Sequence, residues 1–461
     1  MAGGETYNHL TTKLKEKLKK TKTMGPMETL LMSSSVGKGK YNIDISLMDF
    51  YDIDTKARAT EYPGAYVSPS DFCRGALTNE YTDEISKSRA IFVWILKNIS
   101  YPGRHKPVSI TGTETPEFPK DVWEKKVCKR EGFAILFHEM AQACGLESYI
   151  ITGYQKGPTE EHFGSSQTPL PNHWWNAVKI NGEFRFIDIG SASPLHLYNH
   201  LKQPDYFYFL AHPLHLIYTH FPNNPKFQFL SPPISPKTFW SLPYIQPNFF
   251  YDGVKFIDYT DSVFHLEDDE TAEFSIILPS GLGCFAEVDI PNKNATYFNH
   301  LRTLVHMSEQ DGQNVARIII RLNKGKGTGF LKVFTGPKIQ APTNTNPYPL
   351  SFSFMLKHTG DKLPNDFVMT FFTEHDFTIK EPRDLILKCG RGYRFVVATP
   401  CATKPIKLSV RSPSQHNNVF SYFPDEHSYA AEVFLKEPGK WVLAYLTGKD
   451  KWIPFAQYEC H

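Results

Sequence analysis

The chain has 461 residues, a formal net charge of +2, and ordinary proportions of hydrophobic (41%) and charged (21%) residues. Such a composition is typical of a soluble globular protein, and the near-neutral charge excludes a general attraction to nucleic acid or to membranes. We therefore expect no nucleic-acid partner. At roughly 100–200 residues per domain, the length predicts two to four domains. Aromatic residues make up 14% of the chain, which favours a β-rich fold.

The seven cysteines are widely spaced, odd in number and without a Cys-x-x-Cys pair. Residues 1–30 lack the apolar segment of a signal peptide. No stretch approaches the ~20 apolar residues needed to span a bilayer. Together these features predict a reduced, cytoplasmic protein. The lysine-flanked glycine turns at 37–40 and 325–327 lack the context of a phosphate loop, and no plausible metal set is present, so we predict no cofactor and no metal.

The first 44 residues are predicted to form a flexible basic segment. Within residues 10–22, leucines recur among lysines at helical spacing. One interpretation is a short amphipathic helix that makes weak contact with a membrane surface or an acidic partner. The alternative is a solvated tail.

Two helices are predicted in the part that follows. Residues 82–98 carry an apolar stripe near helical spacing, and Thr82 or Asp83 is placed to cap the first turn. Residues 131–144 show a second apolar face, and Gly145 stands where a C-terminal cap belongs.

An antiparallel sheet is predicted after the second helix. Its strands are expected at 148–154, 174–180 and 183–189, and Asn181-Gly182 between the last two is a strong hairpin signal. A helix followed by such a sheet indicates an α+β fold.

The second half of the chain changes character. Residues 201–255 are dense in aromatic residues and prolines, and we predict an extended connector packed on the core. Over 256–461, helix signals nearly vanish and short alternating runs dominate, which predicts one or two β-sandwich modules.

Two residues of the predicted hairpin could carry chemistry. His173 opens one strand, and Asp188 lies near the end of the next. Adjacent strands lie about 4.8 Å apart, so the two side chains can meet where the register allows. The carboxylate would fix the tautomer of the imidazole and stabilise its protonated form. A cysteine at the start of helix 131–144 would complete the set, because a helix N-terminus lowers the pKa of a thiol.

The order of motifs around these residues resembles the transglutaminase-like superfamily. The resemblance rests on Gly132-Phe133-Ala134, Ala143-Cys144-Gly145-Leu146, Gly153-Tyr154, His173-Trp174-Trp175-Asn176-Ala177-Val178 and Asp188. It covers about residues 80–195 and implies a papain-like core, with a helix packed on an antiparallel sheet, within a domain that we place at residues 45–200.

Segments further downstream are similar to the fungal cytokinesis proteins of this superfamily and, next, to the kyphoscoliosis peptidase branch. These segments lie at 187–194, 208–210, 216–222 and 249–253. The fungal resemblance implies a cytoplasmic protein recruited to the cell-division site, where it links the contractile ring to septum formation. The implied partners are contractile-ring proteins, septum-synthesis proteins and a Rho-type GTPase. The fungal proteins typically carry an N-terminal SH3 domain, which we do not find, so we expect a shorter family member or a fragment.

The nucleophile position departs from the superfamily pattern. The nucleophile usually stands two residues before the glycine of the Gly-Phe-Ala motif, which is Arg130 here, and Cys128 lies two residues further upstream. Arginine stays protonated and is a poor nucleophile. The leading hypothesis is a catalytically inactive scaffold. The alternative is a cysteine peptidase or glutamine transferase in which a local rearrangement brings Cys128 to His173. Trp175 and Asn176 would line or brace the cleft, or simply pack in the hairpin.

Overall fold

The computed structural model describes residues 30, 44–101, 118–196, 202–257, 261–267, 271–290, 299–310, 312–322, 327–343, 345–361, 365–399, 405–448 and 451–461. The predicted amphipathic segment at 10–22 lies outside the described residues. No helix in the described part of the chain combines the length and the hydrophobicity needed to cross a membrane.

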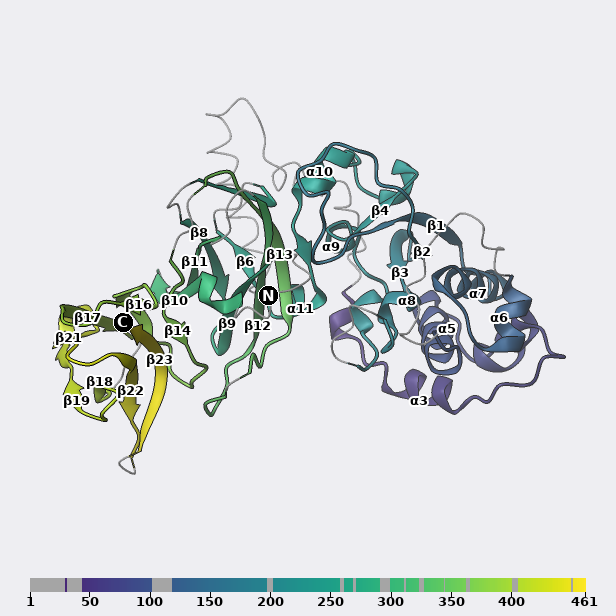
Figure 1. Cartoon of the computed structure of the whole chain (residues 1–461). Helices are drawn as coiled ribbons and strands as arrows, with labels where there is room; N and C mark the ends of the chain where they lie inside the picture. Colours follow the sequence, from purple (N-terminus) through teal and green to yellow (C-terminus); the bar gives the residue numbers. More distant parts are fainter. Residues whose placement is uncertain are drawn as a thin grey trace. The chain divides into compact units, whose positions relative to one another are not determined.

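The chain divides into two compact units. Unit 1 comprises Met1–Gly157 and Ser165–Leu242, and unit 2 comprises Pro158–Gly164 and Pro243–His461. Figure 1 shows most of the helices in unit 1, in purple to teal, and the large sheets in unit 2, in green to yellow.

Unit 1 contains one antiparallel sheet of order β3-β2-β1-β4. Its strands are β1 (Ser148–Gln155), β2 (His173–Ile180), β3 (Glu183–Ile187) and β4 (His220–Pro222). The predicted hairpin is confirmed, because Ile180 pairs with Glu183 across Asn181 and Gly182. Both turn residues have positive φ (50° and 86°), as a tight two-residue hairpin turn requires.

Both predicted helices of unit 1 are confirmed, as α5 (Glu84–Asn98) and α7 (Arg130–Ala143). Asp83 caps α5, because its carboxylate accepts a hydrogen bond from the backbone N–H of Ser86 (2.8 Å). Helix α7 packs on β1 and β2, and Gly145 follows it with a φ of 79°. Further helices with described bounds in unit 1 are η1 (Ile45–Leu47), α3 (Tyr51–Ala59), α4 (Pro69–Phe72), η2 (Cys73–Leu77), α6 (Pro119–Lys125), α8 (Ile189–Ala192), η3 (Tyr206–Tyr208), α9 (Pro213–Leu216), η4 (Pro225–Gln228) and α10 (Pro236–Ser241).

A buried ion pair joins the helices of unit 1. Arg89 on α5 binds both carboxylate oxygens of Asp54 on α3, at 2.7 and 2.8 Å. The guanidinium also lies over the rings of Phe50, Tyr206 and Phe209, at 4.6, 4.2 and 4.8 Å from their centroids. These contacts hold the segment that follows α8 against the helical core.

The segment 201–255 differs from the predicted extended connector. Its first part supplies the short helices α9 and α10, and it supplies β4, which pairs with β1 at the edge of the sheet. The fully buried Lys156, just after β1, anchors this segment, because its ammonium donates to the carbonyls of Phe239 (2.8 Å) and Leu242 (2.9 Å). Aromatic and proline-rich sequence therefore forms a folded part of unit 1. Residues 243–255 fall in unit 2.

Unit 2 consists of two pairs of sheets in a sandwich-like arrangement. The first pair has the orders β10-β11-β8-β6 and β5-β13-β12-β9, with β7 beside β13. Phe256 and Phe274 of one sheet contact Phe352 and Phe354 of the other. The second pair has the orders β14-β23-β22-β18-β19, with β16 beside β23, and β15-β17-β21-β20.

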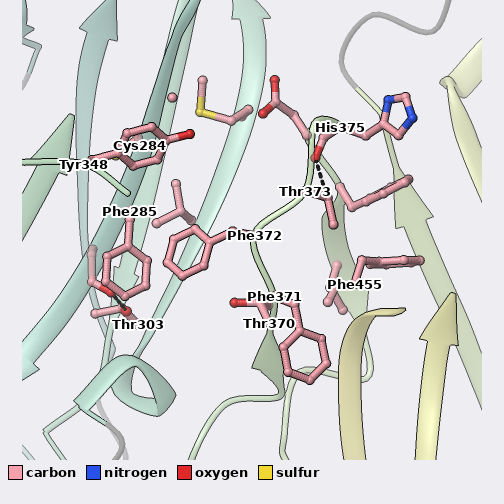
Figure 2. A pocket seen from close by; sticks show the side chains of 17 residues that line it. Cys284, Phe285, Thr303, Tyr348, Thr370, Phe371, Phe372, Thr373, His375 and Phe455 are labelled. Carbon is pink, nitrogen blue, oxygen red and sulfur yellow. Dashed lines mark hydrogen bonds between the residues drawn. The ribbon is translucent and has the colours of Figure 1, made fainter. Parts of the chain in front are cut away.

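The elements of unit 2 are β5 (Tyr244–Ile245), α11 (Pro247–Tyr251), β6 (Lys255–Phe256), β7 (Val263–Leu266), β8 (Ala272–Leu278), β9 (Leu282–Asp289), η5 (Asn299–Arg302), β10 (Thr303–Gln310), β11 (Gln313–Ile320), β12 (Gly327–Pro337), β13 (Leu350–His358), β14 (Met369–Thr370), β15 (Thr378–Glu381), β16 (Ile386–Leu387), β17 (Gly392–Ala398), β18 (Leu408–Arg411), β19 (Asn417–Val419), β20 (Ser421–Phe423), η6 (Pro424–Glu426), β21 (Ser428–Phe434), β22 (Gly439–Leu446) and β23 (Trp452–Cys460). Figure 2 shows an aromatic pocket within this unit, in which Phe285 and Phe372 are in contact.

Candidate functional site

The candidate site of unit 1 is built where two strands end. His173 is the first residue of β2 and lies opposite Gly153 of β1. Asp188 comes directly after β3 and caps the short helix α8, so the strand predicted to reach residue 189 ends two residues earlier. The two residues are therefore not a directly opposed cross-strand pair. The chain leaves the sheet at Asp188, and this departure brings its carboxylate to 2.6 Å from Nε2 of His173.

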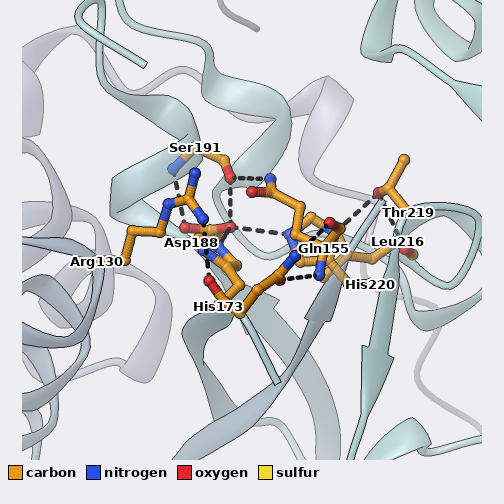
Figure 3. Close-up of polar contacts among 9 residues, drawn as sticks. Arg130, Gln155, His173, Asp188, Ser191, Leu216, Thr219 and His220 are labelled. Carbon is orange, nitrogen blue, oxygen red and sulfur yellow. Dashed lines mark hydrogen bonds and ion pairs between the residues drawn. The ribbon is translucent and has the colours of Figure 1, made fainter. Parts of the chain in front are cut away.

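Asp188 is the centre of a buried hydrogen-bond cluster (Figure 3). Its Oδ2 lies 2.6 Å from Nε2 of His173 and 3.0 Å from Nε2 of His220, and it accepts from the hydroxyl of Ser191 at 2.6 Å. Its Oδ1 accepts from the backbone N–H of Ser191 at 2.9 Å. The carboxylate thus accepts four hydrogen bonds, three at Oδ2 and one at Oδ1. The amide of Gln155 extends the cluster by donating to the hydroxyl of Ser191 at 2.8 Å.

His220, like Ser191 and Gln155, is a member of the cluster that the sequence analysis does not predict as a site residue. It is the first residue of β4, which pairs with the end of β1, so Gln155 lies opposite His220. Its Nδ1 is 2.8 Å from the hydroxyl of Thr219. A strand of three residues has no detectable period, so no sequence pattern marks His220. Its place within the fungal-like segment 216–222 is the one available signal.

The protonation of the cluster follows from its burial. Burial alone would raise the pKa of Asp188, but the adjacent His173 and His220 hold it well below its usual range. The carboxylate is therefore charged and accepts a hydrogen bond from the Nε2–H of each histidine. Burial lowers the pKa of His173 to about 4, and His220 and Arg130 act in the same direction, so His173 is neutral at pH 7. The lone pair of His173 is then on Nδ1, which is buried without a hydrogen-bond partner among the described residues.

Arg130 occupies the start of the helix that faces this cluster. It is the first residue of α7, and its Nη1 donates to the backbone carbonyl of Asn172 at 3.0 Å, directly before His173. Figure 3 shows its side chain extending toward the cluster. Its positive charge also contributes to the lowered pKa of His173. A guanidinium thus lies beside the histidine at the position where the superfamily pattern expects a thiol.

Cys128, the alternative nucleophile, lies two residues before α7. Its side chain is 1% exposed and packs in the hydrophobic core of unit 1. Its backbone N–H donates to the carbonyl of Ser100 at 3.1 Å, which fixes the entry to the helix. Its role as a nucleophile stays a prediction.

Trp175 and Asn176 brace the site from β2. The indole of Trp175 stacks on the ring of His173, with centroids 5.9 Å apart and planes 20° apart. The amide of Asn176 donates to the backbone carbonyl of Ala134 in α7 at 2.9 Å, which ties the helix to the sheet. Gly153 leaves room for this packing, because a Cβ there would clash with the ring of Trp175 and the backbone of Phe221.

Among the described residues, His173, Asp188 and His220 also form a group that could hold a metal ion. Their three ligand atoms lie within 4.8 Å of one another. A metal would have to displace both Nε2 protons, which already bind the carboxylate. The observed distances fit hydrogen bonds within the cluster.

Buried neutral histidines make unit 1 sensitive to acid. Burial lowers the pKa of two histidines of unit 1 from 6.5, that of His173 to about 4 and that of His196 to about 3. Between pH 6.5 and pH 4 the unfolded chain binds protons that the folded chain does not, so stability falls as the pH falls. We expect each of these histidines to lower the free energy of unfolding of unit 1 by up to about 2 kcal/mol when the pH falls from 7 to 5.

Urea unfolding of the chain at pH 7 and pH 5 checks this acid sensitivity. Asp205 acts in the opposite direction, because burial raises its pKa to about 6, and Asp188 titrates below this window. An unchanged urea midpoint for unit 1 would contradict the prediction.

The fold and the site of unit 1 indicate the class of this domain. The helix that starts at the cluster, the histidine that opens a strand and the aspartate that orients it are the arrangement expected for the transglutaminase-like superfamily. Residues 73–189 match the family model described as the transglutaminase-like superfamily, so this part of the chain is a transglutaminase-like domain.

The chain is also similar in sequence to individual proteins of known name. The chain is 26% identical to cytokinesis protein 3 of Schizosaccharomyces pombe, over 92% of this chain and 49% of that protein. It is 26% identical to cytokinesis protein 3 of Saccharomyces cerevisiae, over 82% of this chain and 46% of that protein. It is 30% identical to the kyphoscoliosis peptidase of Mus musculus, over 39% of this chain and 27% of that protein. The chain thus spans about half the length of the two fungal relatives.

Proposed function

We propose that this chain is a catalytically inactive transglutaminase-like scaffold that acts in cytokinesis through protein–protein interactions. One observation supports the absence of catalytic activity. Arg130 is the first residue of α7, and its side chain donates a hydrogen bond to the backbone carbonyl of the residue before His173. A guanidinium stays protonated and cannot attack a carbonyl carbon.

The surroundings of His173 support the same conclusion. A general base needs access to the proton that it abstracts, yet His173 is 0% exposed and Asp188 is 1% exposed. The positive charge of Arg130 opposes protonation of His173, whereas a thiolate in its place would favour it. The cluster therefore serves as a structural centre that joins β1, β2, β4 and α8.

The cellular part of the proposal rests on the fungal relatives, whose printed name is cytokinesis protein 3. We infer a cytoplasmic protein recruited to the division site, where it links the contractile ring to septum formation. Contractile-ring proteins, septum-synthesis proteins and a Rho-type GTPase are the partners inferred. The β-sandwich modules of unit 2 offer additional binding surface for such partners.

The alternative function is that of a cysteine peptidase or a protein-glutamine transferase with Cys128 as the nucleophile. The thiolate would attack an amide carbon, His173 would act first as base and then as acid, and Asp188 would orient His173. The intact His173–Asp188 pair favours this alternative. The burial of Cys128 in the hydrophobic core counts against it.

Iodoacetamide labelling of the folded chain, read residue by residue by mass spectrometry, separates the two functions. For a scaffold, Cys128 should react slowly, and equally slowly in a His173→Ala variant. A His162→Ala variant is the matched control, because the side chain of His162 is 52% exposed. A hyper-reactive Cys128 that becomes unreactive only in His173→Ala would overturn the scaffold proposal.

The cellular part of the proposal is tested separately, with a Cys128→Ser variant in dividing cells. In dividing yeast cells, a fluorescently tagged chain with Cys128→Ser should reach the division site as the unchanged chain does. If neither chain accumulates there, the cytokinesis part of the proposal is wrong.

A further inference from the structure

Two cysteines of unit 1 lie in contact away from the histidine–aspartate cluster. Cys73 begins the π-helical turn η2, and Cys144 is the C-terminal cap of α7. They are 71 positions apart in sequence, yet their Sγ atoms lie 2.8 Å apart. A disulfide bond measures about 2.05 Å, so the thiols are close enough to bond after a small movement.

The surroundings make the two thiols unequal. Cys73 is 0% exposed, whereas Cys144 is partly exposed and is the sulfur that a reagent can reach. The hydrogen bond from Cys73 lowers the pKa of Cys144 to about 7, and Thr78 and Lys87 act in the same direction. The hydroxyl of Thr78 lies 2.9 Å from Sγ of Cys144, and the ammonium of Lys87 donates to its backbone carbonyl at 3.2 Å. The contact with Cys144 and burial raise the pKa of Cys73.

We propose that Cys73 and Cys144 form a site of reversible oxidation, in which a peroxide converts the two thiols to a disulfide. The thiolate of Cys144 attacks one oxygen of the peroxide, the O–O bond breaks, and hydroxide leaves as Cys144 becomes a sulfenic acid. Cys73 then attacks the sulfur of Cys144, the S–O bond breaks, and the proton of Cys73 leaves with hydroxide as water. Two thiols and one hydrogen peroxide give one disulfide and two waters.

The bond would act on the helix that carries Arg130. A disulfide would covalently join η2 to the end of α7, which are in contact through hydrogen bonds of Cys73 and Thr78 with the Cys144 sulfur. It also closes a long loop in the unfolded chain, which stabilises the folded state. Oxidation would therefore stiffen α7 at the end opposite to the histidine–aspartate cluster.

Peptide mapping of the full chain tests this oxidation site. The reduced protein is treated with limiting hydrogen peroxide at pH 7, free thiols are blocked, and peptides are analysed by mass spectrometry. We expect a peptide linked through Cys73 and Cys144, formed at least about tenfold faster than oxidation of Cys284, because burial raises the pKa of Cys284. A thiol reductant should reverse it.

Two variants assign the roles of the sulfurs. In Cys73→Ser, the sulfenic acid of Cys144 should accumulate and be trapped by dimedone. In Cys144→Ser, Cys73 should stay reduced, because it is buried. The mapping of the unchanged chain does not depend on either variant folding. The proposal is wrong if both cysteines remain thiols while Cys284 is oxidised, or if Cys73 is oxidised as fast in Cys144→Ser.

Discussion

Replacing Asp188 with alanine is expected to lower the free energy of unfolding of unit 1 by about 3–5 kcal/mol. The carboxylate is 1% exposed and accepts from His173, His220 and the hydroxyl and N–H of Ser191. Alanine leaves these donors buried without an acceptor, and each such donor costs about 1–3 kcal/mol. The loss of local stability should be largest where β2, β4 and α8 meet.

Urea unfolding measures this loss of stability, and hydrogen exchange shows in which unit it occurs. Both are needed because a chain of two units need not unfold in one step. Amides of β2, β4 and α8 should lose protection, while the sandwiches of unit 2 keep theirs. Asp121→Ala is the control, because the side chain of Asp121 is 48% exposed and its change should stay within about 0.5 kcal/mol. Equal effects of the two substitutions would show that the cluster does not stabilise the fold.

The sequence predicts the local elements of unit 1 well, for physical reasons that lie within each segment. Helix α5 has an apolar stripe and an aspartate cap, and Asn181-Gly182 favours the positive φ angles of its turn. His173 and Asp188 are predicted because they flank this hairpin. Their contact nevertheless depends on the bend at Asp188, which no strand pattern shows.

The remaining parts depend on contacts between distant segments. His220 joins the site because β4 adds to the edge of β1, and a three-residue strand has too few positions for a period. Lys156 can be buried because the backbone carbonyls of Phe239 in α10 and of Leu242 after it accept hydrogen bonds from its ammonium. Cys73 and Cys144 are in contact although they are 71 positions apart in the sequence. Sequence spacing alone contains none of these pairings.

Replacing Arg130 with cysteine is expected to create a reactive thiol. The new side chain would start α7, where the helix dipole lowers the pKa of a thiol from about 8.5 toward 7.5 or below. It would also face His173, whose Nδ1 carries a lone pair without a partner among the described residues. Loss of the guanidinium removes a charge that lowers the pKa of His173, so a thiolate–imidazolium pair can form.

Iodoacetamide labelling at pH 6.5 measures the gain in reactivity at position 130. We expect labelling about tenfold faster or more than in the double variant Arg130→Cys with His173→Ala, since an ordinary thiol is almost wholly protonated at that pH. Arg130→Ser controls for the loss of the guanidinium and should leave every native cysteine as it was. Equal rates in the single and double variants would mean that His173 does not face the start of α7. A fast thiol that depends on His173 would mean that the catalytic geometry survives around the arginine, which is what a scaffold derived from an enzyme should retain.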